Sequence, residues 1–198
     1  MTRLIIWRHG RTEWNATDRV QGHSDVDLDA VGVAQAAESA PRIAALGPDL
    51  IVSSDLRRAA RTAAVLASIT GRTVDYDNRL RERHYGPWQG LRLVEIEERY
   101  PEEYARWRAR LPIRDPAIET VDDLAKRATA AFRDAAERAG GGTAVVVTHG
   151  GTATVGCAGL LGWPPTAAHT LAGLGNCHHA ELQYTSTRGW RLGSYNVP

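Results

Sequence analysis

Two strongly apolar stretches, far apart in the chain, each end in a histidine followed by a glycine. The first, residues 4–7, leads into Arg8 and His9, and the second, residues 144–147, leads one residue later into His149. Continuous apolar runs of this kind are typical of strands buried on both faces of a parallel sheet. We therefore predict that His9 and His149 stand at the carboxyl ends of two buried strands.

Between and after these stretches, predicted strands alternate with predicted helices. Asp29 is expected to cap the first long helix, Ser54 and Asp55 to cap the second, and Gly71 to end the second. The alternation predicts an α/β protein in one domain, residues 1–198: a three-layer α/β/α sandwich around a mostly parallel sheet. The predicted helices span about 30–46, 56–69, 93–100, 102–110, 121–139 and 151–162, and the predicted strands 4–8, 49–53, 73–76, 143–148, 176–184 and 190–195, the last two as a hairpin.

The bulk composition is that of an ordinary globular protein without a strong overall charge. Hydrophobic residues make up 43% and charged residues 24% of the 198, and the formal net charge is +1. No global field draws such a chain to nucleic acid or to an acidic membrane, so neither is an expected partner. Two cysteines without a paired spacing, together with the lack of a signal-peptide pattern, predict a cytoplasmic protein.

Recognition of an anion by this chain has to use arginine. Of the 24 basic residues only Lys126 is a lysine, and it falls inside the predicted helix 121–139. This excludes Schiff-base chemistry and a phosphate-binding loop built around a lysine. Arginine side chains remain, and their forked N–H groups match the oxygens of a phosphate.

Cations from three separate segments are expected to meet at one edge of the sheet. Arg8 and His9 follow the first strand, Arg58 follows the strand 49–53, and His149 follows the strand 143–148. Ligands of open α/β sheets lie beyond the carboxyl ends of the strands, where the first turns of helices also favour anions. We therefore expect His9 and His149 to face each other over a bound phosphate.

Three further residues are candidates for the same pocket. Arg11 and Asn15 follow His9 closely, and Glu82 lies in the irregular, charged segment 79–90 as the candidate acid. The alternative for Glu82 is a surface carboxylate that pairs with neighbouring arginines, and for either histidine alone it is a simple turn residue. No spacing typical of metal ligands is present, so neither a metal nor another cofactor is expected.

Four motifs, in order along nearly the whole chain, resemble the histidine phosphatase (phosphoglycerate mutase-like) superfamily. They are Arg8-His9-Gly10-Arg11-Thr12, residues 54–59 (Ser-Asp-Leu-Arg-Arg-Ala), Leu80-Arg81-Glu82 with residues 86–90, and Thr148-His149-Gly150. The resemblance implies a phosphoglycerate mutase-like fold and a single catalytic domain. It also implies a segment at about residues 83–120 that caps the substrate.

The resemblance further implies a role for each site residue. His9 would be the nucleophile that forms a phosphohistidine, and Glu82 would be the general acid and base. Arg8, Arg58 and His149 would complete the catalytic set by stabilising the phosphoryl oxygens, which removes the need for a metal. The residues expected to bind phosphate or substrate are Arg8, Arg11, Asn15, Arg58, Arg83 and His149.

The phosphatase branch of the superfamily fits better than the mutase branch. Cofactor-dependent mutases carry an insertion between the acid and the second histidine, whereas only 66 residues, 83–148, lie between them here. Residues 51–59 and Gly175-Asn176 are similar to those of glucosyl-3-phosphoglycerate phosphatases. We therefore expect hydrolysis of a small-molecule phosphate ester.

Several alternatives stay open at this point. Residues 82–86 and Trp107-Arg108 resemble the mutase version, so a phosphoglycerate mutase-type transferase is the second candidate, and a non-catalytic protein that binds a phosphorylated ligand is the third. Residues 116–120 differ from the usual Gly-Glu-Ser pattern, so the substrate is a sugar phosphate, a phospho-acid or an aromatic phosphate. Association into a homodimer is also open.

Overall fold

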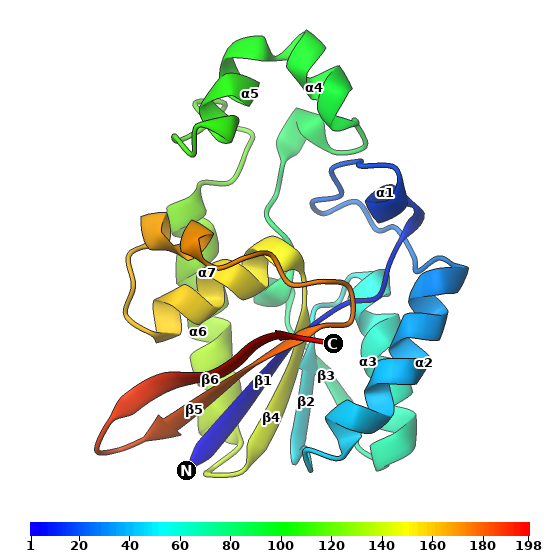
Figure 1. Ribbon diagram of the computed structural model, residues 1–198, viewed down its shortest axis with the longest axis vertical. Coiled ribbons are helices and arrows are strands. Elements are labelled where there is room, and N and C mark those ends of the chain that lie inside the picture. Colours follow the sequence, from blue (N-terminus) through cyan, green and yellow to red (C-terminus); the bar gives the residue numbers. More distant parts are fainter.

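The computed structural model describes residues 1–198 and is built around one six-stranded sheet of order β3-β2-β4-β1-β5-β6 (Figure 1). Strands β3, β2, β4 and β1 are parallel, whereas β5 runs antiparallel to β1 and β6 antiparallel to β5. The mostly parallel sheet and the closing hairpin are therefore confirmed. The strands are β1 (Thr2–Arg8), β2 (Leu50–Ser53), β3 (Val74–Tyr76), β4 (Thr143–Thr148), β5 (His179–Thr185) and β6 (Gly189–Val197).

The two apolar stretches that end in histidine are neighbours at the centre of the sheet. Strands β1 and β4 pair in parallel register from Arg3 opposite Thr143 to Arg8 opposite Thr148. One residue further, the backbone N–H of His9 donates to the carbonyl of Thr148 at 3.0 Å. This register brings His9 level with the end of β4, directly beside His149.

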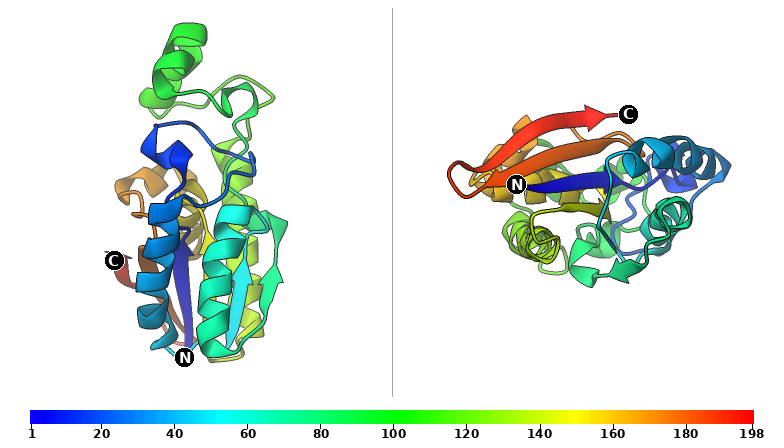
Figure 2. Two further views of the ribbon diagram at one scale, coloured as in Figure 1. Left: turned by 90° about the vertical axis from the view of Figure 1, so that its right-hand side faces the viewer. Right: turned by 90° about the horizontal axis from the view of Figure 1, so that it is seen from below.

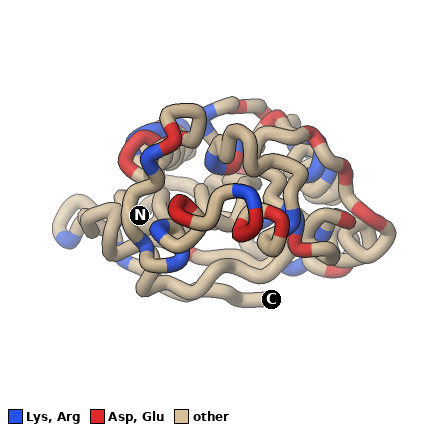
Figure 3. Tube along the Cα trace, turned by 90° about the horizontal axis from the view of Figure 1, so that it is seen from above, with Lys and Arg blue, Asp and Glu red and all other residues tan.

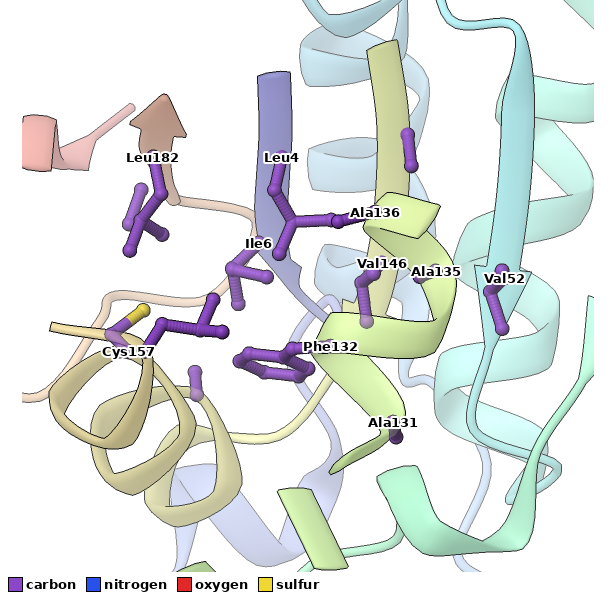
Figure 4. Packing of buried hydrophobic residues seen from close by; sticks show 14 of the residues in the cluster. Leu4, Ile6, Val52, Ala131, Phe132, Ala135, Ala136, Val146, Cys157 and Leu182 are labelled. Carbon is purple, nitrogen blue, oxygen red and sulfur yellow. The ribbon is translucent and has the colours of Figure 1, made fainter. Parts of the chain in front are cut away.

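Helices cover both faces of the sheet, as predicted for a three-layer α/β/α sandwich (Figure 2). Successive side chains of a strand point to opposite faces. Leu4 and Ile6 accordingly belong to the core under α6 (Val121–Arg138) and α7 (Gly150–Leu160), as Figure 4 shows for part of this cluster. Residues Ile5 and Trp7 belong to the opposite core under α2 (Ala30–Ala44) and α3 (Arg57–Thr70).

Helix α2 begins where Asp29 caps it and packs tightly against the end of β1. The Asp29 side chain accepts a hydrogen bond from the backbone N–H of Gly32 at 2.7 Å, which confirms the predicted N-cap. A Cβ on Gly32 would lie 1.9 Å from the carbonyl oxygen of Arg11, and a Cβ on Gly10 would lie 2.5 Å from that of Gly32. Only glycines allow this approach, which holds the turn after His9 against the helix.

Helix α3 begins differently from the prediction. Its N-cap is Leu56, and the first helical N–H, that of Arg57, donates to the Asp25 side chain at 2.7 Å. Asp55 instead forms an ion pair with Arg81. The predicted cap by Ser54 and Asp55 was therefore wrong, because a carboxylate from a distant loop takes this place. The left-handed Gly71 ends the helix as predicted.

Residues 83–120, which we call the projecting segment, rise above the carboxyl ends of the strands (Figure 1). A small aromatic core stabilises the segment: Trp88 is buried and contacts the rings of Tyr85, Tyr100 and Trp107 at centroid distances of 6.5, 6.4 and 6.2 Å. Its elements are η2 (Gly86–Trp88), α4 (Leu93–Arg99) and α5 (Pro101–Arg108); the remaining short helices of the chain are α1 (Glu13–Ala16), η1 (Asn78–Leu80) and η3 (Pro165–Thr170).

The helices and the charge on the face above the strand ends agree with the composition. No helix in the structure has the length and hydropathy needed to cross a membrane. Acidic and basic residues are interspersed over the face above the strand ends (Figure 3), in line with the net charge of +1.

The α6 side of the core supplies a test of the packing. Phe132 is fully buried between α6, α7 and the sheet, and a Cβ on Gly156 of α7 would lie 2.4 Å from its ring. We expect Phe132→Ala to lower the free energy of unfolding by about 3–5 kcal/mol because it leaves a large cavity. Urea denaturation measures the loss. Ile69→Ala, at a half-exposed position of α3, is the control and should change stability by about 0.5 kcal/mol or less.

Candidate active site

A small polar pocket lies beyond the carboxyl end of β1. Its volume is about 150 Å³, enough for a phosphoryl group and little more. Backbone and side chains from the end of β1, the loop after α1, the start of α3 and the segment after η1 form its wall. The lining residues are Arg8, His9, Asn15, Arg19, Val20, Gln21, Gly22, Arg58, Glu82 and Tyr85.

His9 presents one free ring nitrogen to this pocket. Its Nδ1 lies 2.7 Å from the carbonyl oxygen of Gly10, which can only accept, so Nδ1 carries the hydrogen and Nε2 keeps its lone pair. The side chain is buried. Burial, and the positive charges of Arg58 and Arg8, hold the pKa of His9 well below its usual value. A neutral imidazole with a free lone pair is a competent nucleophile.

His149 lies beside His9, with the ring centroids 5.0 Å apart. Its Nδ1 accepts a hydrogen bond from Nε of Arg58 at 3.1 Å, so the ring hydrogen is on Nε2 and is donated to Oγ of Ser54 at 2.9 Å. Burial and the charge of Arg58 keep the pKa of His149 well below its usual value. Both ring nitrogens are thus engaged by protein groups, and His149 here supports Arg58 from behind.

Arg58 is a fully buried cation in the first turn of α3. It donates to His149 through Nε and to the carbonyl oxygens of Ser24 and Gly22, each at 2.8 Å, through its two terminal nitrogens. Burial lowers its pKa to about 10, with a further contribution from Arg8, so it is still charged at neutral pH. A buried positive charge at a helix N-terminus is stabilised by a bound anion.

Arg8, which lines the pocket, has one buried donor without a partner. Its Nη1 donates to the carbonyl oxygen of Leu174 at 2.5 Å, but its Nε is buried and has no hydrogen-bond partner. Burial lowers the pKa of Arg8, while the charge of Glu82 raises it. A buried N–H of a charged group without a partner is costly, and a phosphoryl oxygen would satisfy it.

Glu82 is held at the start of helix α7. Its carboxylate accepts hydrogen bonds from the backbone N–H groups of Gly151 at 2.9 Å, Thr152 at 3.2 Å and Arg83 at 2.8 Å. A Cβ on Gly151 would lie only 2.6 Å from Glu82 Oε1, so glycine is needed for this approach. The carboxyl group therefore stands at a fixed place on the pocket wall. Its partners are backbone N–H groups and the hydroxyl of Thr152, in contrast to the surface pairing with arginines considered above.

The structure brings together most, but not all, of the predicted site residues. Arg8, His9, Asn15, Arg58 and Glu82 line the pocket and His149 adjoins it. Two predicted ligands lie elsewhere. The Arg11 guanidinium forms an ion pair with the α2 cap Asp29, and that of Arg83 donates to the carbonyl of Glu119 and covers the ring of Tyr85.

Other pocket residues were missed from the sequence. Arg19, Gln21 and Tyr85 line the pocket, and Gln21 is buried with its Oε1 unpartnered. Gln21 precedes Gly22, which has a left-handed backbone conformation. A polar residue beside a turn of this kind was the one sequence feature that could have marked Gln21 as a pocket residue. Ser54, which orients His149, belongs to one of the four motifs but was expected only to cap a helix.

A second, larger cavity opens on the other side of the Glu82 carboxylate. Its volume is about 640 Å³, and Gly150 and Gly151 at the start of α7 lie on its wall. Apolar residues, hydroxyl groups, two basic side chains and one acidic side chain line it. Its other lining residues are Trp107, Arg110, Leu111, Pro112, Thr120, Val121, Asp122, Thr154, Val155, Pro165, Thr166, Ala168, His169, Leu171, Ala172 and Gly173.

The side chains of the small pocket could bind a phosphoryl group and react with it. Arg8 and Arg58 supply two positive charges, His9 supplies a neutral nucleophilic nitrogen, and Glu82 supplies a carboxyl group on the same wall. Nowhere in residues 1–198 do three or more His, Cys, Asp or Glu side chains gather as a metal ion would need.

Comparisons with known proteins agree with this chemistry. A family model described as the histidine phosphatase superfamily (branch 1) matches residues 4–198. The chain is similar to a glucosyl-3-phosphoglycerate phosphatase of Mycolicibacterium vanbaalenii, with 36% identity over 98% of this chain and 94% of the relative. It is 34% identical to a probable phosphoglycerate mutase GpmB of Shigella boydii, over 96% and 90% of the two chains. A solved structure of a mycobacterial glucosyl-3-phosphoglycerate phosphatase in complex with VO3 covers 100% of both chains, with 35% identity and a TM-score of 0.91.

The tautomers and charge states of the two histidines can be tested directly. Because burial and the two arginines disfavour the imidazolium forms, His9 and His149 should stay neutral as the pH falls to 6.5 and somewhat below. Long-range ¹H–¹⁵N spectra of labelled protein should show an Nδ1–H form for His9 and an Nε2–H form for His149. Titration of either ring at or above about pH 6.5, the usual value, would contradict this.

Proposed function

The chain belongs to the histidine phosphatase superfamily, and we propose that it is a metal-independent phosphomonoesterase that works through a phosphohistidine at His9. The observation that carries the proposal is the arrangement around one small pocket. The free Nε2 of His9, the unpartnered Nε of Arg8, the buried Arg58 and the anchored Glu82 all belong to it.

In the first step the Nε2 lone pair of His9 attacks phosphorus as the bond between phosphorus and the ester oxygen breaks. Glu82 gives a proton to the departing alcohol oxygen. In the second step the Glu82 carboxylate takes a proton from water, the water oxygen attacks phosphorus, and the P–N bond breaks. Inorganic phosphate leaves and His9 returns to its neutral form.

The arginines supply the charge stabilisation that other phosphatases obtain from metal ions. Arg8 and Arg58 are fixed by hydrogen bonds to carbonyl groups, so they need no reorganisation when charge develops on the phosphoryl oxygens. His149 contributes by aligning Arg58. His149 can donate to a phosphoryl oxygen only if its Nε2–H gives up the hydrogen bond to Ser54.

The alcohol part of the substrate is proposed to occupy the second cavity, under the projecting segment acting as a cap. Glu82 lies between the two spaces, because it lines the small pocket and accepts from Gly151 on the wall of the large one. Hydroxyl groups and the basic Arg110 and His169 suit a polar, acidic alcohol. The relatives named glucosyl-3-phosphoglycerate phosphatase support a phosphorylated sugar acid as the first substrate to examine.

A mutase-type transfer is the second candidate, supported by the relative named a probable phosphoglycerate mutase. It uses the same residues but returns the phosphoryl group from His9 to another hydroxyl. A non-catalytic binding role is less well supported, because binding a phosphate does not require Glu82 to be anchored at the pocket or His9 to keep a free lone pair.

His9→Ala should abolish phosphate release from an aryl phosphate, because no other imidazole lines the pocket. Acid-labile labelling of the protein by ³²P-substrate should disappear with it. His178→Ala is the matched control, since that ring bonds Asn196 and not the pocket, and it should retain turnover. Release that continues in His9→Ala would disprove the phosphohistidine. Stable labelling of the unaltered enzyme without release would favour the mutase.

Prolonged dialysis against a chelator should leave kcat unchanged to within about twofold, because the arginines carry the charge. Adding back Mg²⁺, Mn²⁺ or Zn²⁺ should not raise it. A loss of activity that one of these ions restores would show that the reaction depends on a metal.

Thr166→Trp should narrow the second cavity from an exposed position without disturbing the core. We expect kcat/KM for a sugar-acid phosphate to fall by about tenfold, the equivalent of 1.4 kcal/mol, while that for a small ester such as phosphoserine stays within about twofold. Equal losses for both esters would place the alcohol elsewhere.

A further inference from the structure

A buried ion pair lies directly behind the candidate acid, outside both cavities. Arg127, on helix α6, uses all five of its N–H groups. Its Nε and one Nη2 hydrogen bind the two carboxylate oxygens of Glu119, at 2.6 and 2.8 Å. The other three bind the carbonyl oxygens of Arg79 at 2.7 Å, Arg81 at 2.6 Å and Glu82 at 2.8 Å. One guanidinium therefore holds the whole backbone turn that carries Glu82.

Glu119 ties the same point to the end of the projecting segment. Its carboxylate also accepts from the backbone N–H of His84 at 3.0 Å, and its own N–H donates to the carbonyl of His84 at 2.9 Å. Its carbonyl accepts from Nε of Arg83 at 2.7 Å. The two passages of the chain into and out of the projecting segment thus meet at Glu119, beside the turn that carries Glu82.

The Glu82 residue is consequently held at both ends by two different helices. Its carboxylate is bound by the first N–H groups of α7, and its carbonyl by Arg127 of α6 together with Nε2 of His23, at 2.8 Å. If the Arg127 contacts are lost, the carboxylate still has α7 as a partner, but the backbone behind it loses three hydrogen bonds. It keeps the bond from His23 to the Glu82 carbonyl and the bond from Oγ1 of Thr152 to the Arg81 carbonyl, so it is held less firmly. A shift of about 1 Å at a proton donor is enough to cost a large part of its effect.

We propose that the Arg127–Glu119 ion pair is the positioning device of the general acid, and that it sets the place of the Glu82 carboxyl group against the leaving oxygen. The inference rests on the proposed role of Glu82 and adds two residues that touch neither the phosphate pocket nor the reacting atoms. Both side chains are largely buried, with 19% and 16% of their side-chain surface exposed. Although burial raises the pKa of Glu119, the hydrogen bonds from Arg127 and His84 lower it by more, so the pair stays ionised.

The experiment compares two substrates that differ in how much they need a proton donor. An alkyl phosphate such as 3-phosphoglycerate has a poor leaving group, whereas 2,4-dinitrophenyl phosphate leaves without protonation. The measured quantity is kcat/KM, which reports only the steps up to phosphorylation of His9. Glu82→Gln should lower it by about 10²–10⁴-fold for the alkyl phosphate and by less than about threefold for the dinitrophenyl ester.

Arg127→Met and Glu119→Gln should show the same selectivity with a smaller loss, about 10- to 100-fold for the alkyl phosphate alone. Arg127→Lys should not rescue the loss, because an ammonium group cannot bind three carbonyls and a carboxylate in the plane of the guanidinium fork. Arg133→Met, at an exposed position of the same helix, is the control and should leave both substrates unchanged. In the Glu82→Gln background, adding Arg127→Met should cost little more, because both changes act on one proton transfer.

The outcomes separate the two proposals. Equal losses of both substrates in Arg127→Met and Glu119→Gln, with Glu82→Gln still selective, would overturn the positioning role and leave the acid role intact. A Glu82→Gln variant without selectivity would overturn both. Near-ultraviolet circular dichroism shows whether Arg127→Met folds. If it does not fold, the kcat/KM values of Glu119→Gln decide the outcome, because this change preserves side-chain volume and one acceptor oxygen.

Discussion

The parallel pairing of β1 with β4 is the contact on which the rest of the structure depends. These two central strands bury apolar side chains on both faces, so neither can shift by one residue without moving its core residues to the wrong layer. The same register carries both strands to one edge of the sheet and leaves His9 and His149 side by side. The geometry of the site is therefore a direct product of core packing.

A second consequence of this arrangement is that the site carries the positive charges of Arg8 and Arg58 before any ligand binds. Arg58 is buried and held by two carbonyl groups and a ring nitrogen, and Arg8 keeps an N–H without a partner. Such groups cost free energy in the folded state, and the surrounding core has to offset it. What is gained is preorganisation, because both guanidinium groups are fixed beside the small pocket before a ligand binds. The neutral state of His9 has a related origin, since burial and the positive charges of Arg58 and Arg8 disfavour its imidazolium form.

Most of the fold and the centre of the site could be predicted from the sequence, because both follow local rules. Apolar runs mark the buried strands, Asp29 marks the start of α2, and the rule that strands of a parallel sheet share a carboxyl edge gathers His9, Arg58 and His149. What could not be predicted depends on contacts between distant segments. The cap of α3 comes from Asp25, in the loop that precedes α2, and Arg11, adjacent to the site in sequence, turns away to the α2 cap. Arg127 sits in an amphipathic helix and looks like any solvated cation until the fold places it behind Glu82.

The meeting of His84 and Glu119 has an implication for how this architecture can diversify. The two ends of the projecting segment are hydrogen-bonded to each other. The point where the segment joins the sheet and its helices therefore keeps the same geometry when the number of residues between the two ends changes. The entropic cost of closing a longer loop grows slowly, by about 0.6 kcal/mol for each doubling of length. Residues 85–95 are an exception, because Tyr85 lines the small pocket and the backbone around Leu91 bonds the loop 18–23 that forms its wall. Insertions, deletions or replacements within residues 97–117 are thus the changes compatible with an unchanged reaction centre. Selectivity for the alcohol and chemistry at phosphorus can evolve as separate modules of one chain.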